Sequence, residues 1–124
     1  MSSRPETDAR LARYRQTLLE MHEHRVENRG SPRRWNRLVH RLQRLHLVLR
    51  EDARGRAGIT QMVHDDVPTV RQWAATHALF WDEAVARAEL EREAALPSSI
   101  FEFEAKLILR EYDAGRLNTT WKAK

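Results

Sequence analysis

Apolar residues recur every three or four positions along most of this 124-residue chain, which is the spacing of one helical face. The most regular run lies in 32–52, where the apolar positions from Trp35 to Leu49 step by 3, 4, 3 and 4. No segment shows a convincing alternation of apolar and polar residues, the pattern of a half-buried strand. The pattern therefore predicts an all-α chain of about six helices, at approximately 7–28, 32–52, a short third segment ending at 62 or 64, 68–81, 82–95 and 99–115.

Turn and capping residues separate these segments. Ser31, followed by a proline, is a good N-cap for the second helix. The run Asp65-Asp66-Val67-Pro68 is typical of a helix start, with acids before the first turn and Pro68 near its beginning. Ser99 begins a capping-box pattern, and Gly115 ends the last helix. The segment 54–58 holds two glycines, which are costly inside a helix, so it predicts a loop or a weak helix start.

Helix pairs recur along the chain. The second, fourth and sixth helices begin near 32, 68 and 99, at intervals of 36 and 31 residues, which is typical of stacked helical repeats. The run 66–71, followed by Ala74 and Ala75, is similar to the opening of the second helix of a HEAT repeat. We therefore expect three stacked helical hairpins in a HEAT/armadillo-like right-handed superhelix, with a compact helical bundle as the alternative.

The length and composition favour a single domain. Residues 1–124 are expected to form one helical-repeat domain with flexible ends at 1–6 and 118–124. The absence of cysteine excludes disulfides, thiolate metal ligands and cysteine nucleophiles. No apolar run approaches the ~20 residues of a membrane span, and the polar start lacks the apolar segment of a secretory signal. We expect a soluble, cytoplasmic protein with no membrane contact.

Positive charge is concentrated in the first half. Residues 1–58 hold 14 arginines against 7 acids, whereas 59–124 hold 8 cations against 11 acids. Four arginines, joined by Arg33, step along the second helix by 3, 4 and 3: Arg34, Arg37, Arg41 and Arg44. A phosphate-facing helix has such a stripe, but so does a solvated or acid-paired face. Nucleic acid is the less favoured partner, because no known binding motif is present and aromatic residues do not interleave with the arginines.

A search for chemistry finds no catalytic constellation. His22 and His24 point about 200° apart on a helix, so they cannot share a metal ion. His77 lies on an apolar stripe and is expected to be a hydrogen-bonded core residue, and the run 64–66 is better explained by helix-start chemistry than by an acid–base or metal site. No phosphate loop or nucleophile elbow is present. We therefore expect no enzyme activity, no cofactor and no metal.

The chain from 35 to 121 resembles a small bacterial all-helical family known only as a domain of unknown function, serial number twenty-nineteen. The family's usual ending is similar to 103–117 here, with Tyr112 where tryptophan is frequent. The resemblance implies an armadillo/HEAT-like stack, and it brings no reaction or catalytic residue. The motifs that carry it are Trp35-Asn36-Arg37-Leu38-Val39, Val67-Pro68-x-Val70-Arg71-x-Trp73-Ala74-Ala75 and Phe103-Glu104-Ala105-Lys106-x-x-Leu109-Arg110-Glu111-Tyr112-x-x-Gly115-Arg116-Leu117.

Proteins of this kind are often encoded beside polymorphic toxins and resemble their immunity proteins. The leading hypothesis is therefore a non-catalytic, protein-binding immunity protein that covers a toxin domain stoichiometrically. A general helical-repeat adaptor and a basic nucleic-acid-binding domain are the alternatives, and the sequence leaves the oligomeric state open. The expected contacts to the partner are either the arginine stripe or the acids of the last helix, which are Glu102, Glu104, Glu111 and Asp113.

Overall fold

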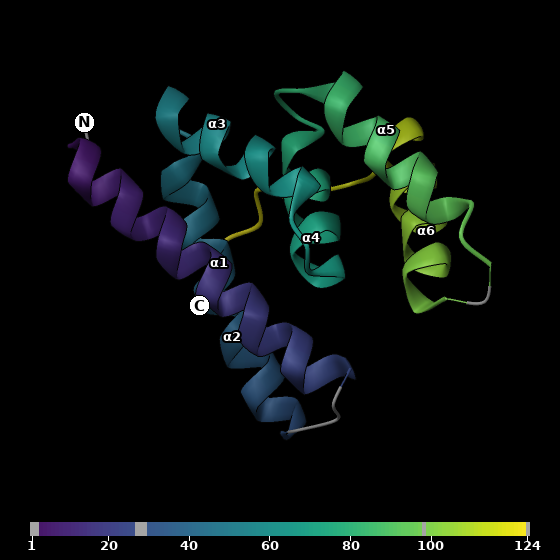
Figure 1. Ribbon diagram of the computed structural model, residues 1–124, viewed down its shortest axis with the longest axis horizontal. Coiled ribbons are helices and arrows are strands. Elements are labelled where there is room, and N and C mark those ends of the chain that lie inside the picture. The colour runs from purple at the N-terminus through teal and green to yellow at the C-terminus, as the bar shows by residue number, and fades with distance from the viewer. Residues whose placement is uncertain (1–2, 27–29, 98, 124) are drawn as a thin grey trace.

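The computed structural model describes residues 3–26, 30–97 and 99–123, and these contain six α-helices and one short 3₁₀ helix (Figure 1). No strand occurs within these ranges, so the predicted all-α class and helix number are confirmed. None of the described helices is both long and apolar enough to cross a bilayer. The elements are α1 (Arg4–Val26), α2 (Pro32–Leu49), α3 (Ala53–Gln61), η1 (Met62–His64), α4 (Pro68–Ala78), α5 (Glu83–Ala94) and α6 (Ile100–Asp113).

Side-chain caps decide several helix ends. The predicted N-caps are confirmed, since Ser31 Oγ accepts from the Arg34 N–H of α2 and Ser99 Oγ accepts from the second residue of α6. The prediction that the second helix reaches residue 52 is wrong. It ends at Leu49 because Asp52 caps the next helix, accepting from the Arg54 N–H at 2.9 Å.

Two other predicted bounds differ from the structure. The first helix begins at Arg4 rather than at residue 7 or 8, and Pro5 lies in its first turn, where a proline costs no hydrogen bond. The fourth helix ends at Ala78, so Trp81 lies in the turns that follow it. Its indole Nε1 donates to Thr60 Oγ1 at 3.0 Å, which ties those turns to α3.

The glycine-rich segment 54–58 lies inside α3, not in a loop. Both glycines allow close helix contacts. A Cβ on Gly55 would lie 2.2 Å from the Leu49 carbonyl oxygen, and one on Gly58 would lie 2.4 Å from a methyl group of Leu11. The cost of glycine in a helix is therefore offset by the close approach of α3 to α2 and α1.

Helix α4 lies at the centre of the molecule. It packs against α1, α3, α5 and α6, and seven of its eleven residues are buried. Figure 1 shows α1 and α2 as one antiparallel pair on one side of α4 and the α5–α6 pair on the other. Ala74, Ala75 and Ala78 are fully buried, and their small side chains let neighbouring helices approach α4 closely. This arrangement fits a stack of hairpins as well as a helical bundle.

The segment after α6 runs back across the molecule to α2 (Figure 1). Gln43 Nε2 donates to the carbonyl oxygens of Thr119 at 2.9 Å and Trp121 at 2.7 Å, and Trp121 packs edge-on against His40. The described residues of 118–124 therefore pack on the fold, which differs from the expected flexible end; residue 124 lies outside the described residues.

Two stacked histidines lie in the core. The rings of His46 and His77 are parallel with centroids 3.7 Å apart, and both side chains are buried. His77 Nδ1 lies 2.7 Å from the hydroxyl of Tyr14, and His46 Nδ1 lies 3.1 Å from Gln43 Oε1. The predicted core role of His77 is thus confirmed. Burial, with the nearby Arg50 guanidinium, lowers the pKa of His46 to about 3, and burial also holds the pKa of His77 well below its ordinary value.

A buried carboxyl group joins α5 to α4. Glu93 is 2% exposed, and its Oε1 accepts from Gln72 Nε2 at 3.0 Å while its Oε2 has no hydrogen-bond donor. Burial, reinforced by the neighbouring Glu89, raises the pKa of Glu93 to about 8. Glu93 is therefore protonated in the folded protein at neutral pH.

The histidine pair predicts a loss of stability in mild acid. The unfolded chain binds protons near pH 6.5, whereas folded His46 stays neutral down to about pH 3. The free energy of unfolding should therefore fall below pH 6.5, by up to about 1.4 kcal/mol per pH unit for each histidine. His46→Gln should remove one histidine's share of this slope in urea titrations between pH 7.5 and 5. The matched change His64→Gln at an exposed position should keep the slope, and an unchanged slope in His46→Gln would contradict the assignment.

The buried Glu93 predicts that the protein also loses stability as the pH rises, the opposite of the dependence expected from the histidines. Its folded pKa lies above that of the unfolded chain, so its contribution to stability is lost as pH rises from about 4.5 to about 8. Glu93→Gln keeps the shape and removes the ionisation. The variant should be more stable than the parent at pH 7.5, and the difference should shrink by about 1.4 kcal/mol per pH unit toward pH 5. Exposed Glu91→Gln is the control, and a Glu93→Gln variant that is less stable at pH 7.5 would refute the proposed protonation.

Candidate functional site

The run 64–66 borders an open hollow of about 880 Å³ between η1, α4 and α5. Asp65 Oδ1 accepts from the Val67 N–H at 3.0 Å in the turn just before α4, whereas no side chain caps the first turn of that helix, so the helix-start interpretation stays a prediction. Asp65 also receives two hydrogen bonds from Arg15 of α1, at 2.8 and 3.1 Å, and these hold the pKa of its carboxyl group below the ordinary value. This side chain therefore joins α1 to the start of α4.

The other charges of this hollow also pair with each other. Arg92 donates to both carboxylate oxygens of Glu89, at 2.9 and 2.7 Å, and Arg71 Nε lies 3.6 Å from the same carboxylate. Burial acts to raise the pKa of Glu89, but these arginines outweigh it and leave that pKa below its ordinary value. The carboxylate is thus ionised and neutralised within the protein, not held as a free acid or base.

Within the part of the chain that the structure describes, the histidines and acids do not converge on a metal site. Among the described residues, no group of three or more His, Asp and Glu side chains is placed to hold an ion. His22 Nδ1 lies 2.8 Å from Thr69 Oγ1 of α4, whereas His24 Nε2 lies 2.8 Å from the Ser31 carbonyl oxygen. The predicted separation of these two rings is confirmed.

The four acids expected to contact a partner all have cationic neighbours within the protein. Glu102 accepts from Lys106 at 3.0 Å on the same helix, and Glu111 accepts from Arg116 at 2.6 Å. Glu104 pairs with Arg25 of α1, and Asp113 pairs with Arg87 of α5. Sequence reasoning missed the last two pairs because their partners come from distant segments.

A row of apolar side chains on α6 is uncovered. Phe103 is 69% exposed, Ile100 is 55% exposed and Leu107 is 37% exposed, and at 3.6 residues per turn they fall within about 60° of the helix surface. We call these three residues the α6 stripe. By the same geometry Glu104 and Glu111 flank it on one side. The composition of α6 could have indicated it, because this helix carries more apolar residues than one buried face requires.

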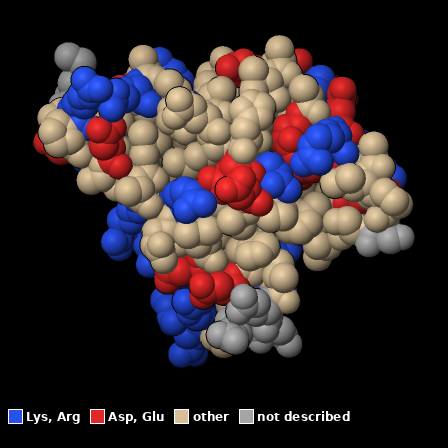
Figure 2. Space-filling view, viewed as in Figure 1, with Lys and Arg blue, Asp and Glu red and all other residues tan. Residues whose placement is uncertain are grey.

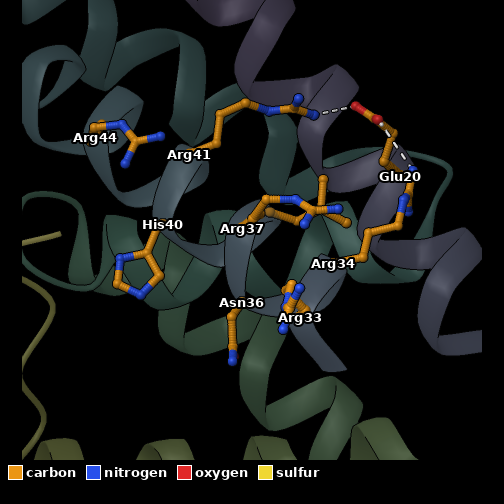
Figure 3. A pocket seen from close by; sticks show the side chains of 9 residues that line it. Glu20, Arg33, Arg34, Asn36, Arg37, His40, Arg41 and Arg44 are labelled. Carbon is orange, nitrogen blue, oxygen red and sulfur yellow. Dashed lines mark hydrogen bonds and ion pairs between the residues drawn. The ribbon is translucent and has the colours of Figure 1, made fainter. Parts of the chain in front are cut away.

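The arginines of α2 line a second open hollow, of about 820 Å³ (Figure 3). Arg34 and Arg41 both pair with Glu20 of α1. Arg34 Nη2 lies 3.4 Å from Glu20 Oε1, and Arg41 contacts the other carboxylate oxygen. Arg33 and Arg37 are exposed and have no hydrogen bond or ion pair among the residues the structure describes. The hollow thus brings together the predicted stripe residues Arg34, Arg37, Arg41 and Arg44, with Arg33, around a single acid.

A smaller hollow of about 310 Å³ adjoins this one and shares Arg41 and Arg44 with it. Arg10 and Arg13 of α1 line it as well, and none of its lining residues is an acid. Figure 2 shows basic side chains on the left and lower parts of the molecule, on the side of α1 and α2, with acidic side chains beside them. We call the seven arginines of the two hollows the arginine face: Arg10, Arg13, Arg33, Arg34, Arg37, Arg41 and Arg44.

The described geometry therefore offers two contact surfaces of different chemistry, the α6 stripe and the arginine face. Comparisons of the chain with family models, with curated proteins and with solved structures each gave no match. The resemblance noted from the sequence motifs stays a prediction.

Proposed function

We propose that this chain is a protein-binding domain that acts by covering part of its partner with the outer face of α6. The observation that carries the proposal is the α6 stripe, above all Phe103, which is 69% exposed. Large aromatic side chains are costly to leave in water and are enriched at the centres of protein interfaces. An apolar row beside Glu104 and Glu111 has the usual layout of such an interface, with an apolar centre and a charged rim.

Contacts that anchor α6 at both of its ends favour the same function. Arg25 of α1 pairs with Glu104 and lies over the Phe101 ring at 5.2 Å from its centroid. At the other end of the helix, the Tyr112 hydroxyl donates to Glu83 at 2.8 Å and lies 3.2 Å from the Leu79 carbonyl oxygen. A helix held at both ends loses little freedom on binding, so more of the contact energy is available for affinity.

A non-catalytic mode of action fits the placement of the titratable groups. The groups with the largest pKa shifts are buried, and none of them lines either of the two larger hollows; they are Tyr14, His46, His77 and Glu93. A substrate in those hollows would therefore not reach them. The proposed action is stoichiometric binding without turnover.

The specific form that we propose is a cytoplasmic bacterial immunity protein, whose partner is a toxin domain with an apolar groove. In this form α6 blocks access to the toxin's active site, and Glu104 and Glu111 meet basic residues at the groove's edge. Immunity predicts that co-expression with the product of the adjacent upstream gene rescues cells from that product. A stable partner without any toxicity would instead indicate a general adaptor.

Replacement of the stripe tests the proposed contact. Phe103→Asp should weaken 1:1 binding to the partner by at least about 30-fold, as expected for an aromatic residue at the centre of an interface, and should abolish rescue. Because Phe103 is mostly exposed, the free energy of unfolding should change by only about 0.5 kcal/mol. Calorimetry and growth assays with the toxin measure both effects.

Ala57→Asp is the matched control, since it places the same charge at an exposed position of α3. This variant should bind and rescue like the parent. If Phe103→Asp rescues equally well, α6 is not the contact surface; if the parent itself fails to rescue, the immunity form of the proposal is refuted.

A further inference from the structure

We propose that the arginine face binds the phosphate backbone of a double-stranded nucleic acid, independently of base sequence. The inference goes beyond the proposed protein contact and uses a different surface. It starts from an imbalance of charge. Five arginines line the larger hollow, whereas Glu20 is the one acid among its lining residues.

The arginines of this face are not all used within the fold. Elsewhere, arginines such as Arg15, Arg25 and Arg87 each pair with an acid from another helix. On the arginine face, Glu20 serves both Arg34 and Arg41, and Arg10 pairs with Glu6 of its own helix at 3.8 Å. Arg13, Arg33 and Arg37 are exposed and have no acidic partner within the described ranges, so their guanidinium groups remain available for an anion.

The spacing suits a repeating anion better than a single one. Arg33 and Arg44 are eleven residues apart on α2, which is about 16 Å along the helix axis, with Arg37 between them (Figure 3). A duplex presents one phosphate charge per ~1.7 Å of its axis, so about nine phosphates lie within that length. The guanidinium group also binds phosphate oxygens in a bidentate manner. A row of arginines on a straight helix can therefore engage several phosphates at once.

The residues that line the larger hollow favour a duplex over the other classes of anionic partner. An acidic protein surface would need an apolar centre to exclude water, but the larger hollow offers only Leu38, which is 5% exposed. The apolar residues of the smaller hollow, Leu45 and Val48, follow Arg44 on α2 and so lie beyond the end of the arginine row, not at its centre. Single-stranded nucleic acids are bound through aromatic side chains on which bases stack, and no Phe, Tyr or Trp lines this hollow. Charge without an apolar or stacking surface is the composition that recognises a phosphate backbone.

The test measures binding of a fluorescent duplex of mixed sequence, as DNA and as RNA, by anisotropy. For about four phosphate contacts, the logarithm of the association constant should fall with the logarithm of salt concentration with a slope of about −4, so that affinity drops about a hundredfold between ~50 and ~200 mM. Comparing the two duplexes identifies which nucleic acid is the better ligand. No binding to either duplex at ~50 mM salt would overturn the proposal.

The variant R33E/R37E should weaken binding at least about tenfold at ~50 mM salt and bring the slope closer to about −2, because two contacts are lost. The matched control R4E/R110E changes the net charge equally at exposed positions outside the face and should keep the slope. An equal loss in both variants would overturn the site, since it would show an effect of net charge alone.

Polyglutamate that competes with the duplex at equal charge concentration would overturn the choice of a nucleic acid over an acidic protein.

Discussion

The fold depends on the burial of α4 on nearly all sides. The buried polar side chains of a helix in that position need hydrogen-bond partners from other helices, because water cannot reach them. Thr69 contacts His22 and His77 contacts Tyr14, both from α1, while Gln72 donates to Glu93 of α5 and to the Phe101 carbonyl oxygen of α6. These bonds fix the position of the surrounding helices around a centre of small apolar residues.

The burial of α4 also explains why the titratable groups with perturbed pKa values lie in the core. The stacked histidines and the protonated glutamate have unusual pKa values because they are buried beside α4, not because they face a substrate. Perturbed ionisation is often a sign of an active site, yet it arises equally in a polar core. In this protein the buried titratable groups with strongly perturbed pKa values hold helices together.

The two exposed surfaces rely on different forces. The α6 stripe offers apolar area, whose attraction is short-ranged and insensitive to salt. The arginine face offers charge, whose attraction reaches about a Debye length and weakens steeply with salt. Both are backed by rigid helices: α6 is held through Glu104 and Tyr112, and α2 is held through Gln43, which fixes the chain after α6. A molecule built in this way can present two contacts of different specificity at the same time.

Local patterns in the sequence determined the helices, because spacing, prolines and capping serines act over a few residues. The all-α class, the Ser31 and Ser99 caps and the core role of His77 were all predictable on that basis. Pairings between distant segments were not predictable from the sequence, because they depend on which helices come into contact. Only the tertiary structure paired Glu104 with Arg25 and Asp113 with Arg87, stacked His46 on His77, and left Phe103 and Arg37 exposed. A charge or an aromatic ring becomes available to a partner when the fold gives it no neighbour, and that depends on the three-dimensional arrangement of the helices.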